Sequence, residues 1–359
     1  MVFIKILPAA AVGGAILALG GQVRAQSQEL EVKLSGQINR SIMHADDGVQ
    51  SGVFHVDNEN SSTRFRLTGS APIAQGLKAG VLWEMEFQSN ASDTVNFVNR
   101  ESKAVLEERH IDLFFEHRFG KLSLGQGNGA ADNGVQVDLS GTAVAHYANV
   151  PNIGGAFTFR TPAGGVGPTI AQTISDQDFE GRYDRLRYDT PTCGGFRIAA
   201  SQGIKDSRDV AELALWYAGD FGSIGKLAAA LGHSSQDAAT APGSIEDKFV
   251  GGSVSWLHPS GFNTTFAISE RDVAAGRKGK FNYFKAGYKF GKHVISGDYA
   301  ISEDQAAADD QGKVMGVAYV YTPINWAEIY AAYKRHSLNR TTTLFEDIDI
   351  VLVGTRVKF

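Results

Sequence analysis

The last ten residues of the chain, IVLVGTRVKF (350–359), decide how the rest of the sequence is interpreted. One face of this segment is apolar or β-branched up to the last residue: Val351, Val353, Thr355, Val357 and Phe359. The opposite face carries Gly354, Arg356 and Lys358. A chain end normally frays in water, so this alternation indicates a paired strand with one face in a non-aqueous medium. Transmembrane barrels meet both conditions, because every backbone group in lipid needs a partner and no sheet edge stays open.

The start of the chain carries the pattern of a secretory signal. Lys5 precedes an apolar stretch over residues 6–21, and Val23-Arg24-Ala25 supplies a small–x–small cleavage pattern. We expect cleavage after Ala25 and a single domain over residues 26–359. A mitochondrial presequence or a soluble helix is the alternative, which the lack of a polar face disfavours. After residue 25, no apolar run approaches the ~18 residues that a spanning helix requires.

The composition excludes several classes of function. The chain has 34 basic and 39 acidic residues and a formal net charge of −5, which becomes −7 when Lys5 and Arg24 leave with the signal. The sequence contains no cluster of aromatic and basic residues of the kind that would indicate nucleic-acid binding. The single cysteine, Cys193, excludes an internal disulfide, and no His or Cys spacing predicts a zinc site. We therefore expect no metal, no cofactor, no nucleic-acid partner and, without a nucleophile motif, no enzyme.

The rest of the sequence repeats one unit, an alternating segment followed by a turn. In residues 77–88, apolar side chains occupy one face while Lys78, Glu84 and Glu86 occupy the other. A soluble β-sandwich would alternate in the same way. Ring side chains near the segment ends favour a barrel instead, because they are typical of the aromatic girdles at membrane interfaces. The apolar faces carry among others Trp83, Trp216, Tyr330 and Phe359.

Sixteen strands can be counted along the chain. They are 30–43, 61–71, 76–88, 107–118, 121–127, 178–190, 195–204, 209–219, 224–233, 247–258, 262–270, 281–290, 293–302, 312–322, 326–336 and 346–359. Short turns alternate with long polar connections at 44–60, 89–106, 128–178, 234–246, 271–280 and 303–311. The sequence therefore predicts an all-β, transmembrane antiparallel barrel of sixteen strands, wide enough to leave an aqueous channel.

From about Leu30 to Phe359 the chain resembles the general bacterial porins, the trimeric diffusion channels of Gram-negative outer membranes. The resemblance rests on the order and spacing of several segments together, rather than on any single segment. These segments are VKLSGQINR (32–40), STRFRLTG (62–69), GLKAGVLWEMEF (76–87), ERHIDLFFEHRFGKLSLGQ (108–126), FEGRYDRLRYDTP (179–191) and GGFRIAAS (194–201), with the terminal Phe.

The resemblance implies a pore constriction. In that family the long third loop folds into the barrel, and acidic residues on it face arginines on the wall. The corresponding loop is 128–178, where Asp132 and Asp138 best match the constricting part and Asp176 and Asp178 are the other nearby acids. The wall arginines carry over as Arg64, Arg109 and Arg182, with Arg66, Arg185 and Arg187 beside them. Such opposed charges orient water and polar solutes. Arginines merely solvated on a sheet face are the alternative.

Some residues depart from the family pattern. Arg109 shares its face with the apolar Ile111 and Leu113, so it reaches the pore only if a β-bulge shifts the alternation or a neighbouring subunit covers that wall. Gln126 stands where relatives often place a basic residue, and the loop lacks their PEFGG-type motif.

We expect a passive outer-membrane channel for ions and small hydrophilic solutes, with weak ion selectivity of undecided sign. The resemblance implies a homotrimer latched through the loop at 89–106, in contact with outer-membrane lipid and lipopolysaccharide. A channel selective for a sugar, phosphate or organic acid is the first alternative. A barrel-based outer-membrane enzyme or adhesin is the second.

Overall fold

The computed structural model describes residues 30–238, 246–273 and 277–359, and the expected signal lies outside them. The first strands and a short 3-10 helix are β1 (Glu31–Asp46), β2 (Ser51–Asp57), η1 (Glu59–Ser61), β3 (Arg64–Ala74), β4 (Leu77–Gln88), β5 (Val105–His117) and β6 (Gly120–Asn128). The long connection contains η2 (Val150–Asn152), β7 (Thr158–Arg160), β8 (Val166–Thr169) and α2 (Ile170–Thr173). None of the helices in these ranges is long and apolar enough to cross a membrane.

The remaining elements run to the C-terminus as a series of antiparallel strands. They are β9 (Arg182–Asp189), β10 (Phe196–Lys205), β11 (Arg208–Asp220), η3 (Gly222–Ile224), β12 (Lys226–Gln236), β13 (Asp247–Leu257), β14 (Phe262–Val273), β15 (Arg277–Phe290), β16 (His293–Glu303), β17 (Gln311–Ile324), β18 (Ala327–Asn339) and β19 (Ile348–Lys358).

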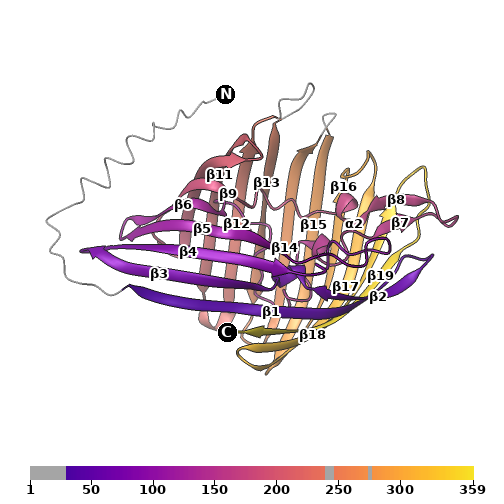
Figure 1. Cartoon of the computed structure of the whole chain (residues 1–359), viewed down its shortest axis with the longest axis horizontal. Helices are drawn as coiled ribbons and strands as arrows, with labels where there is room; N and C mark the ends of the chain where they lie inside the picture. Colours follow the sequence, from indigo (N-terminus) through magenta and orange to yellow (C-terminus); the bar gives the residue numbers. More distant parts are fainter. Residues whose placement is uncertain (1–29, 239–245, 274–276) are drawn as a thin grey trace.

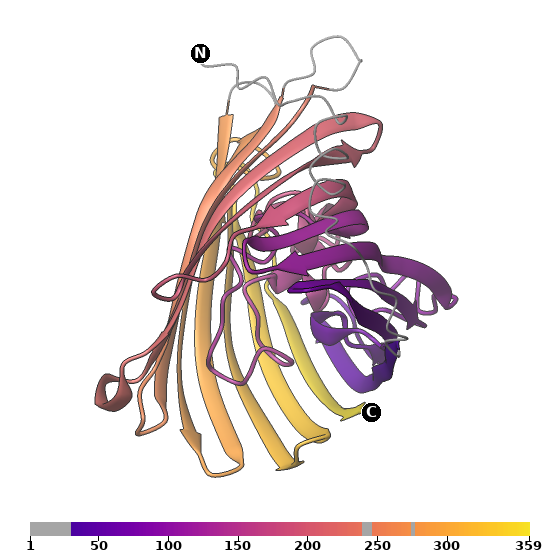
Figure 2. The same ribbon diagram turned by 90° about the vertical axis from the view of Figure 1, so that its left-hand side faces the viewer.

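Seventeen of these strands form one sheet that closes on itself. β1 pairs with β3 through its first half and with β2 through its second half, so β2 and β3 share one place in the wall. The barrel therefore has sixteen wall positions, as the alternation predicted. The orange and yellow strands β13–β19 form one side and the indigo and purple strands β1–β6 lie opposite (Figures 1 and 2).

The seam that closes the barrel joins the two ends of the described chain. β1 and β19 are antiparallel, with Gln37 opposite Lys358 and Asp46 opposite Asp349. The amide of Gly36 donates to the carbonyl of Phe359 over 2.9 Å, and the amide of Phe359 donates back to Gly36 over 3.0 Å. The C-terminal strand therefore has a partner through its last residue.

The two faces of the wall differ as the sequence predicted for most strands. Outward apolar residues are widely exposed, including Val353 at 50 % and Phe284 at 50 %. Lys285, which follows Phe284, is fully buried on the inside. Two ring residues expected in the girdles point inward instead. Tyr330 is buried and its hydroxyl donates to Asn39, and Trp216 donates its indole N–H to the carbonyl of Ala130.

Two of the long connections expected from the sequence are largely strand. Residues 51–57, inside the expected loop 44–60, form β2, because Phe54 packs inward against Phe157 of the long connection rather than facing solvent. β14 and β15 extend into the expected loop 271–280, where Lys278 pairs across the strands with Glu270. Both segments were predicted as loops because they are rich in polar residues. Such residues also occur in strands, where pairing with a residue of the neighbouring strand replaces contact with water.

The long connection between β6 and β9 packs against inward-facing side chains of the wall. The amides of Val137 and Leu139 donate to the hydroxyls of Ser253 and Ser255 on β13, each over 2.9 Å. An apolar core joins this connection to the wall. Its largest members include Phe157, Phe159, Ile153, Ile170 and Ile174 from the connection and Phe54, Phe249, Phe281, Tyr330 and Ile348 from the wall. Residues 129–181, called the inner loop below, are thus held inside the barrel wall.

A charge on the outward face of β19 should cost folding energy according to its depth. We expect Val353→Arg, near the middle of the strand, to destabilise the folded barrel by ~2–4 kcal/mol, and Val357→Arg, near the strand end, by ~0–1 kcal/mol. Urea titration of folding into lipid vesicles measures both values. Equal costs at the two positions would contradict a lipid-facing outer surface.

Candidate pore constriction

A cavity of about 630 Å³ lies between the inner loop and the opposite wall. Arg64 of β3, Arg109 of β5 and Arg182 of β9 line it from the wall. The inner loop lines it with Asp132, Asp176 and Asp178. Four of the residues expected at the constriction therefore meet here, namely Arg64, Arg109, Arg182 and Asp132, together with the two loop acids that the sequence ranked lower.

Glu84 of β4 organises the arginines. Its side chain is 2 % exposed and lies 2.5 Å from Nη2 of Arg66, 2.8 Å from Nε of Arg109 and 3.8 Å from Nε of Arg64. Arg109 also donates to Glu86, which accepts a hydrogen bond from Ser62. Three guanidiniums therefore share two carboxylates, which leaves the wall cluster with an excess of positive charge. The two glutamates were not predicted to belong to the constriction, although both lie on the polar face of residues 77–88.

A β-bulge brings Arg109 to the inside of the barrel. In the β4–β5 pairing, Glu84 lies opposite His110 and the next residue, Met85, lies opposite Glu108. Arg109 is the extra residue between them, so the alternation of β5 shifts by one at this point. The structure thus confirms the bulge that the sequence offered as one of two explanations, because Ile111 stays outside at 49 % exposure while Arg109 contacts Glu84.

Arg182 and Asp132 lie in the cavity with unused hydrogen-bonding atoms. Nε of Arg182 and Oδ2 of Asp132 are buried, and neither has a hydrogen-bond partner in the described part of the chain. Buried polar atoms normally find protein or water partners. Both atoms are thus buried without a partner, while their side chains line the cavity.

The loop acids are held by the loop itself. Asp178 accepts hydrogen bonds from the amides of Asn133 and Val135 over 2.6 and 2.8 Å, and Asp176 accepts one from Nε2 of Gln136 over 2.7 Å. Burial raises the pKa of Asp176 to about 6, and burial together with the neighbouring carboxylates of Asp176 and Asp132 raises the pKa of Asp178. The negative side of the cavity is therefore weaker near neutral pH than a count of its carboxylates suggests.

Arg185 and Arg187, expected beside the constriction, hold the start of the inner loop instead. Arg185 is 3 % exposed, forms a bidentate pair with Asp112 and donates to the carbonyl of Asn128 over 2.9 Å. Arg187 donates to the carbonyl of Gly129 over 2.7 Å. Both line a second cavity of about 560 Å³ at the end of the barrel with the short turns.

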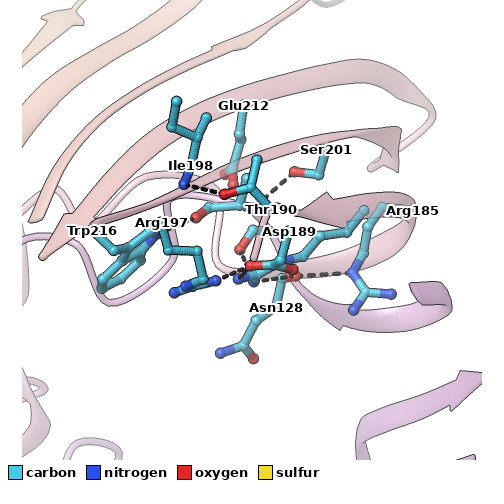
Figure 3. Close-up of polar contacts among 12 residues, drawn as sticks. Asn128, Arg185, Asp189, Thr190, Arg197, Ile198, Ser201, Glu212 and Trp216 are labelled. Atoms are coloured by element: carbon cyan, nitrogen blue, oxygen red, sulfur yellow. Dashed lines mark hydrogen bonds and ion pairs between the residues drawn. The ribbon is translucent and has the colours of Figure 1, made fainter. Parts of the chain in front are cut away.

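The next two amides of the inner loop are bound by the neighbouring strands. The amides of Ala130 and Ala131 donate over 2.8 Å to Ser201 of β10 and Glu212 of β11. Figure 3 shows these two side chains above Arg185 and Asp189. Asp189 pairs with both Arg187 and Arg197, so a connected polar network fixes where the loop leaves the wall.

The expectation that Asp138 faces the arginines is wrong. Its side chain is 6 % exposed and pairs with Lys285 of β15, which is fully buried. A buried lysine needs a compensating charge, and Asp138 supplies it at the wall rather than in the opening. Asp138 was favoured from sequence because it lies in the middle of the loop, and no local signal revealed the lysine that binds it.

Comparison with known proteins identifies the family. Residues 9–341 match the Gram-negative porin family, so the chain belongs to it. The fold resembles that of an anion-selective porin from Comamonas acidovorans, with 19 % sequence identity and a TM-score of 0.67. The match covers 92 % of this chain and 100 % of that porin. It also resembles the outer membrane channel DcaP of Acinetobacter baumannii, with 12 % sequence identity and a TM-score of 0.58. This match covers 92 % of this chain and 97 % of DcaP. No curated protein matches the chain.

Membership of this family defines what the barrel does. The protein is a passive diffusion channel of the Gram-negative outer membrane and not an enzyme. At the identities found, the likeness to the solved structures shows the fold alone.

Removing the charge that organises the arginines should change ion selectivity. We expect Glu84→Gln to shift the reversal potential in a salt gradient towards anions, because it removes a negative charge shared by three guanidiniums. Glu116→Gln removes the same charge in the second cavity and should have a smaller effect. Equal shifts from the two variants, measured in planar bilayers, would argue against a constriction at Glu84.

Proposed function

We propose that the constriction of this channel is the gap between the arginines on β3, β5 and β9 and the acids of the inner loop. The proposal rests on one observation: the same cavity is lined by Arg64, Arg109 and Arg182 of the wall and by Asp132 and Asp176 of the inner loop. Charges of opposite sign across a narrow opening create a transverse field, which favours small polar solutes over apolar ones. The proposed constriction therefore comprises the charged residues that line this cavity.

The proposed channel prefers anions weakly near neutral pH. Arginine stays charged at any physiological pH, whereas the raised pKa values of Asp176 and Asp178 reduce the negative charge of the loop. Charges in the narrow opening act on a passing ion more strongly than screened charges at a distance. The net charge of the whole chain, which is negative, therefore decides selectivity less than the constriction does.

The pH dependence of selectivity tests this proposal. Asp176, with a pKa of about 6, is charged above that pH and neutral below it, so the loop loses negative charge as the pH falls. We expect the anion preference to increase between about pH 7 and about pH 5, measured as the reversal potential across a planar bilayer in a salt gradient. Asp176→Asn should remove part of this change.

The control for that experiment is Asp349→Asn, whose side chain pairs with Arg335 on the outward-facing side of β18 and β19. This variant should keep the full pH dependence. A reversal potential that is independent of pH in the unaltered protein, or equal pH dependence in Asp176→Asn, would remove the loop acids from the proposed constriction.

We also propose that the channel is a homotrimer whose outward apolar band contacts outer-membrane lipid and lipopolysaccharide. The family resemblance supports this, and one similar structure, OmpT of Vibrio cholerae, was solved in a trimer form. The loop expected to latch onto a neighbour packs partly on its own barrel, since Phe97 contacts Phe54 and Phe157, while Val98 at its tip is 91 % exposed.

Oligomeric state is directly measurable. We expect the refolded protein to migrate as a trimer in unheated detergent electrophoresis and as a monomer after heating. Val98→Asp should weaken the trimer if the tip contacts a neighbour, whereas Val166→Asp, at another exposed loop position, should not. A monomer at every protein concentration would contradict the trimer.

A further inference from the structure

The second cavity, of about 560 Å³, lies at the end of the barrel with the short turns, and none of the described residues lines both it and the proposed constriction. In outer-membrane barrels the short turns face the periplasm, so the cavity lies on that side. Among the described residues, five lysine or arginine side chains and three carboxylates line it. The cavity is therefore positively charged in a chain whose net charge is negative.

Two of the carboxylates in this cavity are already balanced by arginines. Asp112 forms a bidentate pair with Arg185. Asp189 binds Arg187 through both of its oxygens, over 2.8 and 2.9 Å. Arg197 pairs with the same Asp189. Two carboxylates therefore face three guanidiniums, which leaves the charge of Arg197 in excess.

Lys121 of β6 adds a further cation to the cavity. It lies opposite Asp189 in the pairing of β6 with β9 and opposite Glu116 in the pairing of β5 with β6. It nevertheless forms no hydrogen bond and no ion pair within the described ranges. Its ammonium lies 4.5 Å from the centre of the Phe114 ring, and this cation–π contact holds it on the inside of the wall. The ammonium is therefore positioned but not neutralised.

Arg197 of β10 presents a free edge of its guanidinium. Its Nη1 donates to Asp189, whereas Nε and Nη2 donate to no atom in the part of the chain that the structure describes. Figure 3 shows the side chain between Trp216 and Asp189, and the guanidinium carbon lies 5.3 Å from the centre of the indole ring. Unlike Nε of Arg182, Nε and Nη2 are not enclosed by protein. This edge of a guanidinium matches two oxygens of a carboxylate or phosphate.

Lys121 and Arg197 are close enough to bind one small anion together. Their strands, β6 and β10, both pair with β9, so two strand spacings, or about 10 Å, separate the two backbones. The guanidinium of Arg197 extends to Asp189, which is the residue opposite Lys121. Two long side chains and one oxyanion can fill the gap that remains.

We propose that the second cavity is an oxyanion-binding site, in which Lys121 and the free edge of Arg197 hold one phosphate or carboxylate group of a solute. The site is separate from the proposed constriction. An anionic solute that has passed the constriction meets this second set of donors before it reaches the periplasm. Phosphate esters and organic acids share the chemistry that these donors recognise.

Isothermal titration calorimetry of the refolded protein in detergent tests the proposal, with inorganic phosphate and succinate as separate probes at constant ionic strength. We expect saturable binding of at least one probe. Lys121→Gln and Arg197→Gln should each weaken this binding by about tenfold or more, because each removes a charge-assisted hydrogen bond. Arg197→Lys keeps the charge but loses the two-donor edge, so its affinity should lie between those of Arg197→Gln and the unaltered protein.

The matched control is Lys78→Gln, which removes the same charge from β4 at the same end of the barrel. Lys78 does not line the second cavity, so this variant should bind both probes as the unaltered protein does. Lys121 has no ion-pair partner among the described residues, so Lys121→Gln keeps the proposal testable if Arg197→Gln does not fold.

The probe that binds more tightly identifies whether the site favours a phosphate or a carboxylate group. The absence of saturable binding for both probes, or equal affinities in Lys121→Gln and Lys78→Gln, would overturn the proposal. Neither result would alter the reversal potentials that test the proposed constriction, so the two proposals can fail independently.

Discussion

The closed ring of backbone hydrogen bonds is the constraint on which the rest of the structure depends. Lipid offers no partner for an exposed amide or carbonyl, so a strand-built membrane protein needs both ends of its sheet to meet. Here the reciprocal bonds between Gly36 and Phe359 complete the ring. Closure fixes which face of each strand meets lipid, because successive side chains alternate between the two faces. It therefore also fixes the set of side chains that point into the interior.

A barrel of this width cannot fill its interior with wall side chains alone. The inner loop resolves this by dividing the interior into two parts. On one side, loop residues such as Phe157 and Ile170 pack into an apolar core with wall residues such as Phe281 and Ile348. On the other side, the arginines of β3, β5 and β9 face a water-accessible cavity. Packing on one side of the loop thus holds the charged opening on the other.

The sequence predicted the parts of the fold that follow from alternation. The strand count was predictable because each membrane-spanning strand alternates apolar and polar side chains. The seam at Phe359 was predictable because a sheet in lipid has to close, which leaves the first and last strands as partners. β2 was not, since its inward face is apolar only where the loop covers it, as Phe54 shows. Within the site, Arg64 and Arg182 followed from the family resemblance. Around Arg109 the broken alternation allowed either a bulge or a covering subunit, and only the strand register decides for the bulge. The binding of Asp138 by Lys285 was not predictable, because it depends on a contact 147 residues apart in the chain.

The central claim is that the barrel encloses a permanent aqueous path bordered by charged side chains. The most direct test is the current carried by the purified, refolded protein after insertion into a planar lipid bilayer. The account predicts stepwise increases in current, each with a conductance that rises with the salt concentration of the bath. Folded protein that inserts into the bilayer without any stepwise conductance would contradict it.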